Sequence, residues 1–134
     1  MSSTRREPEA VQAPQAVVSV LTVDDDPRFL RLARDVVEAT PGFRSVGEAA
    51  TGEAALGLVP ILRPKLVLMD VRMPGIGGVE AARRIGQASS GQIAVILMSA
   101  DAHLLACVGK PRGTVGVVRK DKLSPAVLRA LWGS

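Results

Sequence analysis

The sequence is poor in the residues that build disulfides, zinc sites and base-stacking surfaces. Its 134 residues include one Cys, one His, one Trp, two Phe and no Tyr. The lone Cys107 excludes a disulfide within the chain, and Cys107 with His103 offers no plausible zinc set. With only Phe29, Phe43 and Trp132 as aromatic residues, a stacking platform for single-stranded nucleic acid is hard to assemble. The core is therefore expected to be aliphatic.

The charge and hydropathy patterns exclude further classes of partner. The 17 basic residues are scattered among 13 acidic ones without a long basic run, so the net charge of +4 does not predict nucleic-acid binding. No apolar run approaches the roughly 20 residues of a membrane span, and the first residues lack the apolar core of a secretion signal. Length and composition predict a single globular domain in the cytoplasm, away from membranes.

Strand-like and helix-like segments alternate along the chain after its first residues. Residues 1–15, rich in Ser, Arg, Glu, Gln, Ala and Pro without a period, predict a disordered tail, and residues 16–134 a single domain. Apolar periodicity and capping residues predict the elements that follow. The strands are expected at 17–23, 45–49, 66–69, 93–98 and 115–118, and the helices at 27–39, 51–59, 78–87, 101–108 and 124–132.

This alternation predicts an α/β fold. Strands separated by helices imply right-handed crossovers and a doubly wound, five-stranded parallel sheet with helices on both faces. We expect the flavodoxin-like strand order 2-1-3-4-5. The fourth helix should be short or irregular, because Gly109, Pro111 and Gly113 follow it closely and end it by about Val108.

Polar side chains stand at the carboxyl ends of four predicted strands. Asp24, Asp25 and Asp26 follow the first strand and Asp70 ends the third. Ser99 ends the fourth strand and Lys120 the fifth. In a sheet of order 2-1-3-4-5 these ends converge on one rim, where open α/β sheets bind ligands.

The chemistry of that rim follows from its residue types. Crowded carboxylates repel one another unless a cation holds them together, and Mg²⁺ prefers such oxygen ligands on an open rim. With a cation in place, Asp70 can act as a carboxylate nucleophile on phosphorus. Lys120 offers a positive charge to the phosphoryl oxygens, and the Ser99 hydroxyl offers a hydrogen bond.

Four motifs occur in order along the chain: Val-Asp24-Asp25-Asp-Pro, Leu-Met-Asp70-Val-Arg-Met-Pro-Gly, Leu-Met-Ser99-Ala and Arg-Lys120-Asp. Together they resemble the receiver domain of two-component response regulators, over nearly the whole chain beyond the tail. The resemblance implies that Asp70 accepts a phosphoryl group from a histidine kinase or phosphotransfer protein. It also implies that Asp25, Asp70 and the backbone carbonyl of Arg72 ligate Mg²⁺, with Asp24 acting through water.

The resemblance also assigns a switch. It implies that Ser99 and Lys120 carry a conformational response to an unknown downstream protein. The family's positions that tune the lifetime of the phosphate are here Arg72 and Asp101, and we hypothesise that these two pair across the mouth of the site and shield the phosphate. One position departs from the family: Val117 stands where an aromatic switch residue is usual, and valine is too small and stiff for that role.

Two other function classes stay open. An atypical or pseudo-receiver would act as a phosphorylation-independent protein-binding scaffold, which Val117 favours and the acidic residues with Lys120 do not. An enzyme of the haloacid dehalogenase type would use Asp24 and Asp26, but Arg28 stands where its motif has Thr or Val. We expect no enzyme beyond a receiver that catalyses its own phosphorylation and dephosphorylation. Homodimerisation, and truncation from a longer chain with a DNA-binding domain, are left open.

Overall fold

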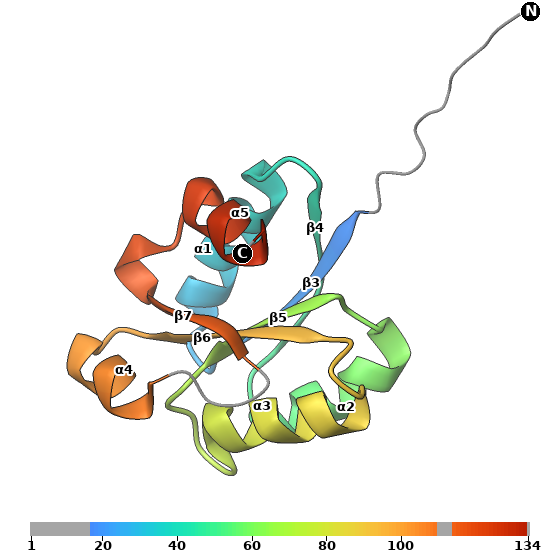
Figure 1. Ribbon diagram of the computed structural model, residues 1–134, viewed down its shortest axis with the longest axis vertical. Helices are drawn as coiled ribbons and strands as arrows, with labels where there is room; N and C mark the ends of the chain where they lie inside the picture. The colour runs from blue at the N-terminus through green and yellow to red at the C-terminus, as the bar shows by residue number, and fades with distance from the viewer. Residues whose placement is uncertain (1–16, 110–113, 134) are drawn as a thin grey trace, which may run out of the picture.

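Five strands alternate with five α-helices in residues 17–109 and 114–133, which the computed structural model describes (Figure 1). The predicted tail at 1–15 lies outside the described residues. No helix in the described part is both long and apolar enough to cross a lipid bilayer. The strands are β3 (Val18–Val23), β4 (Phe43–Ala49), β5 (Leu66–Asp70), β6 (Ala94–Ser99) and β7 (Thr114–Arg119); the helices are α1 (Pro27–Ala39), α2 (Gly52–Leu62), α3 (Gly77–Ala88), α4 (Ala102–Val108) and α5 (Pro125–Gly133), with the 3-10 turn η1 (Lys120–Lys122) before α5.

The strand order places the polar strand ends on one rim. The described strands pair in parallel in the order β4-β3-β5-β6-β7, which is 2-1-3-4-5 in chain order and confirms the predicted fold. Because β3 and β5 are neighbours, Asp24 and Asp70 lie side by side where these strands end. The pairing of Ser99 with Arg119 continues the rim across β6 and β7.

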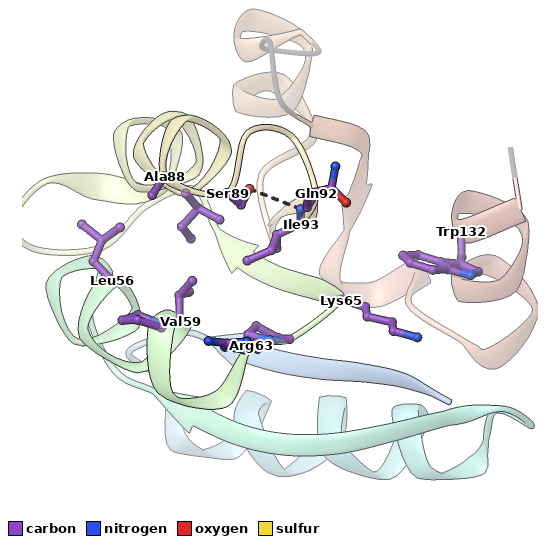
Figure 2. Close-up of a pocket in the computed structure, with 12 residues that line it drawn as sticks. Leu56, Val59, Arg63, Lys65, Ala88, Ser89, Gln92, Ile93 and Trp132 are labelled. Atoms are coloured by element: carbon purple, nitrogen blue, oxygen red, sulfur yellow. Dashed lines mark hydrogen bonds between the residues drawn. The ribbon is translucent and has the colours of Figure 1, made fainter. Parts of the chain in front are cut away.

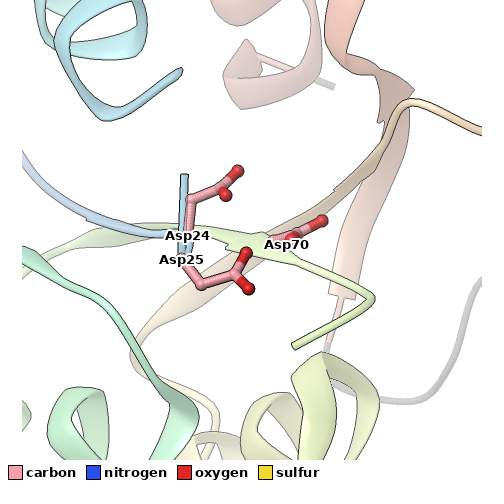
Figure 3. Close-up of side chains that lie close together, drawn as sticks. All are labelled: Asp24, Asp25 and Asp70. Atoms are coloured by element: carbon pink, nitrogen blue, oxygen red, sulfur yellow. The ribbon is translucent and has the colours of Figure 1, made fainter. Parts of the chain in front are cut away.

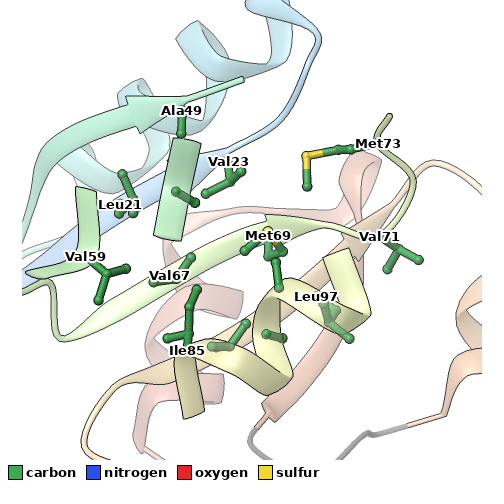
Figure 4. Close-up of a cluster of buried hydrophobic side chains, with 14 of the residues drawn as sticks. Leu21, Val23, Ala49, Val59, Val67, Met69, Val71, Met73, Ile85 and Leu97 are labelled. Carbon is green, nitrogen blue, oxygen red and sulfur yellow. The ribbon is translucent and has the colours of Figure 1, made fainter. Parts of the chain in front are cut away.

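Apolar side chains on both faces of the sheet explain its two helical layers. In β5, Leu66 and Leu68 belong to a buried cluster shared with α1 and α5. Val67 and Met69, which alternate with them, belong to a second cluster shared with α2, α3 and α4 (Figure 4). Figure 1 shows the same division, with α1 and α5 on one side of the sheet. A central parallel strand buried on both faces reads as a continuous apolar run.

Side-chain caps fix the starts of the first two helices. The Arg28 backbone N–H donates to Asp26 Oδ1 at 2.9 Å, directly before α1. The Ala54 backbone N–H donates to the Thr51 hydroxyl at 3.0 Å, directly before α2. Caps of this kind satisfy N–H groups that have no partner within the helix.

The predicted end of the second helix, at residue 59, is wrong. α2 continues through Pro60 to Leu62. Pro60 has no N–H to donate, but the next turn is closed by the Arg63 backbone N–H, which donates to the Val59 carbonyl at 2.8 Å. Leu62 also packs against the buried cluster of α2 and α3. Tertiary packing here outweighs the local effect of proline.

The fourth helix is short, as predicted. α4 contains seven residues. The carboxylate of Asp101 caps it by accepting the backbone N–H groups of His103 at 2.9 Å and Leu104 at 3.2 Å. The residues invoked to end this helix fall partly at 110–113, which lie outside the described residues.

A cavity of about 770 Å³ opens at the opposite end of the sheet from the acidic rim. Figure 2 shows Val59, Lys65, Ile93 and Trp132 among the side chains around it. Lys65 and Ile93 directly precede β5 and β6, so the cavity faces the amino ends of these strands. It is therefore separate from the carboxylates at their carboxyl ends.

The core cluster of α3 predicts a large cost for removing one side chain. Ile85 is fully buried, so Ile85→Ala should lower the free energy of unfolding by about 2 to 5 kcal/mol. Ile61, which is 74% exposed on α2, provides the matched control. Ile61→Ala should change stability by less than about 0.5 kcal/mol. Urea unfolding of both variants measures the difference, and equal costs would contradict the packing described.

Candidate acidic site

Three carboxylates converge where β3 and β5 end. Asp24 and Asp25 directly follow β3, and Asp70 is the last residue of β5 (Figure 3). One carboxylate oxygen from each of the three lies within 4.8 Å of the others. Asp24 is completely buried and Asp70 is 4% exposed, whereas Asp25 faces solvent. The predicted metal-binding and phosphoacceptor carboxylates are thus brought together.

Asp24 has two differently used oxygen atoms. Its Oδ1 accepts the backbone N–H of Asp26 at 2.8 Å, which fixes the turn into α1. Its Oδ2 is buried and accepts no well-aligned hydrogen bond, although the Lys120 ammonium lies 2.5 Å away as an ion pair. Lys120 therefore stabilises this oxygen as an ion pair, because Coulomb attraction does not require the alignment that a hydrogen bond does.

Lys120 places a positive charge beside two of the carboxylates. Its ammonium nitrogen is 2.5 Å from Asp24 Oδ2 and 3.5 Å from Asp70 Oδ1, and its side chain is 17% exposed. Lys120 opens η1 immediately after β7, and the Arg119 guanidinium binds Asp121 across this turn at 2.5 and 3.0 Å. The sequence placed Lys120 at the end of the fifth strand, one residue beyond the observed end of β7.

The surroundings of Asp70 make its charged form unfavourable. Burial raises the pKa of its carboxyl to about 6, from an ordinary value of 3.8, and the negative charge of Asp24 adds to this rise. The Lys120 charge and the Arg72 backbone N–H act in the opposite direction and offset only part of it. A further cation beside Asp70 would therefore stabilise its carboxylate.

The donor set fits Mg²⁺. Three carboxylates supply the hard oxygen ligands that this ion prefers. The buried Asp24 Oδ2 lacks an aligned hydrogen-bond donor, and the repulsion of Asp24 and Asp70 is relieved by positive charge. The exposed Asp25 leaves the cluster open to solvent, as suits an ion that keeps several of its waters.

Among the described residues, the Arg72 backbone N–H hydrogen-bonds to the Asp70 carboxyl, whereas the side chains of the remaining predicted residues lie around the cluster with no hydrogen bond or ion pair to it. Ser99, nearly buried at the end of β6, accepts the backbone N–H of Asp101 on its hydroxyl at 3.0 Å. Arg72 is exposed, and no ion pair joins it to Asp101 in the part of the chain described. The Asp101 carboxylate instead caps α4. Val117, half-buried in β7, packs against the α4 side of the core.

Two residues that the sequence did not single out shape the loop after Asp70: Gly78 in α3 and Glu53 in α2. A side chain at Gly78 would overlap the backbone carbonyl of Asp70, so α3 can approach the acceptor strand only with glycine there. The Glu53 carboxylate accepts the Ile76 backbone N–H at 3.3 Å and lies against Gly75, whose φ is +87°. The Gly-rich run after Met-Pro was the available signal, because glycine marks positive φ and close approach.

Phe29 is a third residue that the sequence did not single out for the site. It lies in the first turn of α1, and the Lys120 ammonium is 4.7 Å from its ring centroid. The sequence pattern assigned it only to the apolar stripe of the helix. No local signal distinguishes a ring that packs in the core from one that contacts a cation.

Comparison with known proteins identifies the family. Residues 20–130 match the response regulator receiver domain. The chain is 38% identical over 109 residues to protein-glutamate methylesterase/protein-glutamine glutaminase 3 of Paramagnetospirillum magneticum, covering 81% of this chain and 30% of that protein. It is 32% identical over 118 residues to the nitrate/nitrite response regulator protein NarL of Escherichia coli, covering 87% of this chain and 54% of that protein. The chain belongs to the response regulator receiver domain family.

Solved structures support the same conclusion. The signal receiver domain of NarL from Mycobacterium tuberculosis is 29% identical, with a TM-score of 0.72 over 88% of this chain and 98% of that one. The response regulator domain of Thermotoga maritima CheB is 25% identical, with a TM-score of 0.70 over 87% and 95%. The described chain spans about half of one curated relative and under a third of the other, and nearly all of these isolated domains.

The close approach at Gly78 predicts that alanine is not tolerated there. Gly78→Ala should lower the free energy of unfolding by about 1 to 3 kcal/mol, because the added methyl group collides with the Asp70 carbonyl. Gly57, in α2, is the control, because a methyl group added there would meet only open space. Gly57→Ala should raise stability by about 0.5 to 1 kcal/mol, as alanine favours helix. Chemical denaturation decides, and a tolerated Gly78→Ala would contradict the geometry.

The raised pKa of Asp70 predicts that removing its charge increases the stability of the fold, by an amount that depends on pH. The folded chain holds a proton on Asp70 up to about pH 6, whereas the unfolded chain loses it near 3.8. The native state therefore binds more protons in this window, and stability falls as pH rises through it. Asp70→Asn should be more stable than wild type by about 1 to 3 kcal/mol at pH 7.5 without divalent cations.

The gain should shrink to well under about 1 kcal/mol near pH 4 and disappear near pH 3, where Asp70 is protonated in both states. Asp121→Asn is the control, because a hydrogen bond from Arg119 lowers the pKa of Asp121 and removal of that charge should give no gain. Urea midpoints at several pH values measure both variants. A gain for Asp70→Asn that does not change with pH would refute this explanation.

Proposed function

We propose that the chain is a phosphoacceptor receiver that acts in the cytoplasm. Asp70 takes a phosphoryl group from a histidine kinase or phosphotransfer protein in a Mg²⁺-dependent reaction, and a downstream protein reads the result. The observation that carries this proposal is the convergence of Asp24, Asp25 and Asp70 within 4.8 Å, with the Lys120 ammonium beside them. Membership of the receiver family supports it.

Asp25, Asp70 and the backbone carbonyl of Arg72 would hold the cation, with Asp24 acting through water. When bound, Mg²⁺ supplies charge neutralisation for the phosphoryl oxygens and for the crowded carboxylates. Asp24 and Asp25 come from the turn after β3, whereas Asp70 and Arg72 come from the end of β5 and the loop after it. Ligands on two neighbouring strands make the site sensitive to the register of the sheet.

The transfer requires an ionised Asp70. One of its carboxylate oxygens attacks the phosphorus, and a new O–P bond forms while the bond from phosphorus to the donor histidine nitrogen breaks, leaving its electron pair on that nitrogen. Lys120, 3.5 Å from Asp70 Oδ1, can then pair with the transferred oxygens. The protein contributes position and charge, which are the main requirements of phosphoryl transfer.

Ser99 and Lys120 are proposed to carry the response. The Ser99 hydroxyl accepts the Asp101 N–H, so turning it to donate to a phosphoryl oxygen changes the contact just before α4. A response through this contact does not need the aromatic residue that Val117 replaces. The phosphate can shift the chain between two states only by the difference in its affinity for them.

Arg72 and Asp101 are proposed to tune how long the phosphate lasts. An ion pair between them across the site would exclude water, but Asp101 caps α4 in this structure. Only Asp101 Oδ1 makes that cap, so the pair with Arg72 would form through Asp101 Oδ2 while the cap stays in place.

The direct test is phosphate incorporation with acetyl phosphate and Mg²⁺, read by mass spectrometry. Wild type should gain a single hydroxylamine-sensitive phosphate, and this should be lost when EDTA removes the cation. Asp70→Asn should gain none, whereas Asp35→Asn, which alters an exposed carboxylate in α1, should behave as wild type. A wild-type chain that stays unmodified would support the scaffold alternative, and a phosphate on Asp70→Asn would place the acceptor elsewhere.

A further inference from the structure

The Lys120 ammonium has an aromatic neighbour as well as its carboxylates. It lies 4.7 Å from the ring centroid of Phe29 and within ion-pair distance of Asp24 and Asp70. Phe29 comes from α1 on one face of the sheet, whereas Lys120 follows β7 at its edge. The ring and the carboxylates therefore hold the same charge from different elements.

The start of α1 fixes the place of the ring. Asp26 caps the helix, Pro27 occupies its first turn, and Phe29 packs against the buried cluster of α1 and α5. The same Asp26 backbone donates to Asp24 Oδ1 at 2.8 Å. The turn that orients the Asp24 carboxylate thus also orients the Phe29 ring toward the Lys120 ammonium.

A ring face suits an ammonium group that must turn. The face attracts a cation through its quadrupole, and this attraction is stronger where water is excluded, as beside a side chain that is 17% exposed. The ring accepts no conventional hydrogen bond in a fixed direction, so the three N–H donors of Lys120 stay available to oxygen atoms. The ammonium can therefore redirect its donors from Asp24 to a phosphoryl group while keeping the ring contact.

We propose that Phe29 is a positioning residue that holds the Lys120 ammonium over the acidic cluster through its π face and thereby speeds phosphoryl transfer to Asp70. This inference rests on the proposed function. The other phenylalanine, Phe43, makes an edge-on contact with Trp132 at 6.3 Å between centroids and opens β4, at the opposite end of the sheet from the cluster. Phe43 is the matched control.

The test compares variants of equal bulk that differ in ring charge. Site-specific incorporation of mono-, di- and trifluorinated phenylalanine at position 29 withdraws charge from the ring face with little change of size. The rate constant for phosphorylation by acetyl phosphate should fall stepwise along this series and by about two- to thirtyfold in Phe29→Leu. Phe29→Tyr, which keeps a ring face, should recover most of the rate, and Phe43→Leu should leave it unchanged.

A second measurement tests the contact between Phe29 and Lys120 independently of the phosphorylation rate. The Lys120 ε-methylene protons should show an upfield ring-current shift in the NMR spectrum of the unphosphorylated wild type, and Phe29→Leu should abolish it. A rate that is constant along the fluorinated series would overturn this inference alone, as would the absence of the shift. A wild-type chain that takes no phosphate would overturn the proposed function and this inference together.

Discussion

An ammonium group shared by two carboxylates is the contact on which the site depends. Lys120 lies 2.5 Å from Asp24 and 3.5 Å from Asp70, and both carboxylates are largely removed from water. Two buried like charges are costly without a counter-charge. The pKa of Asp70 nevertheless rises to about 6, so Lys120 offsets only part of the burial and repulsion. The unfavourable burial and repulsion that Lys120 leaves uncompensated favour the binding of a divalent cation.

The parallel sheet makes that contact possible. Asp24 and Asp70 lie at the ends of neighbouring strands, whereas Lys120 follows β7. In the sheet, β7 lies three strands away from β3, which is about 14 Å at the usual distance between neighbouring strands. The η1 turn and the long lysine side chain close that distance, and Phe29 meets the ammonium from α1. On the opposite face, Gly78 lets α3 approach the Asp70 backbone. Elements of both helical layers thus meet at the Asp70 backbone and at the Lys120 ammonium beside its carboxylate.

The strand order and the acidic cluster could be predicted from the sequence because both follow from local patterns. Alternating apolar segments fix the sheet, and residues at the ends of its parallel strands must share a rim. Phe29 could not be recognised as part of the site, because its contact with Lys120 depends on how α1 packs on the sheet. The approach of Gly78 to Asp70 is equally non-local. The second helix was predicted to end at residue 59, yet packing around Leu62 continues it through Pro60.

The most direct test of the account is a crystal structure of the wild-type chain with Mg²⁺ and beryllium fluoride, an analogue of a phosphoryl group. The account predicts beryllium bonded to an Asp70 carboxylate oxygen, Mg²⁺ between Asp25 and Asp70, and the Lys120 ammonium turned from Asp24 toward a fluoride while it remains over the Phe29 ring. Beryllium fluoride absent from Asp70 under these conditions, or a Lys120 that points away from it, would contradict the central claim.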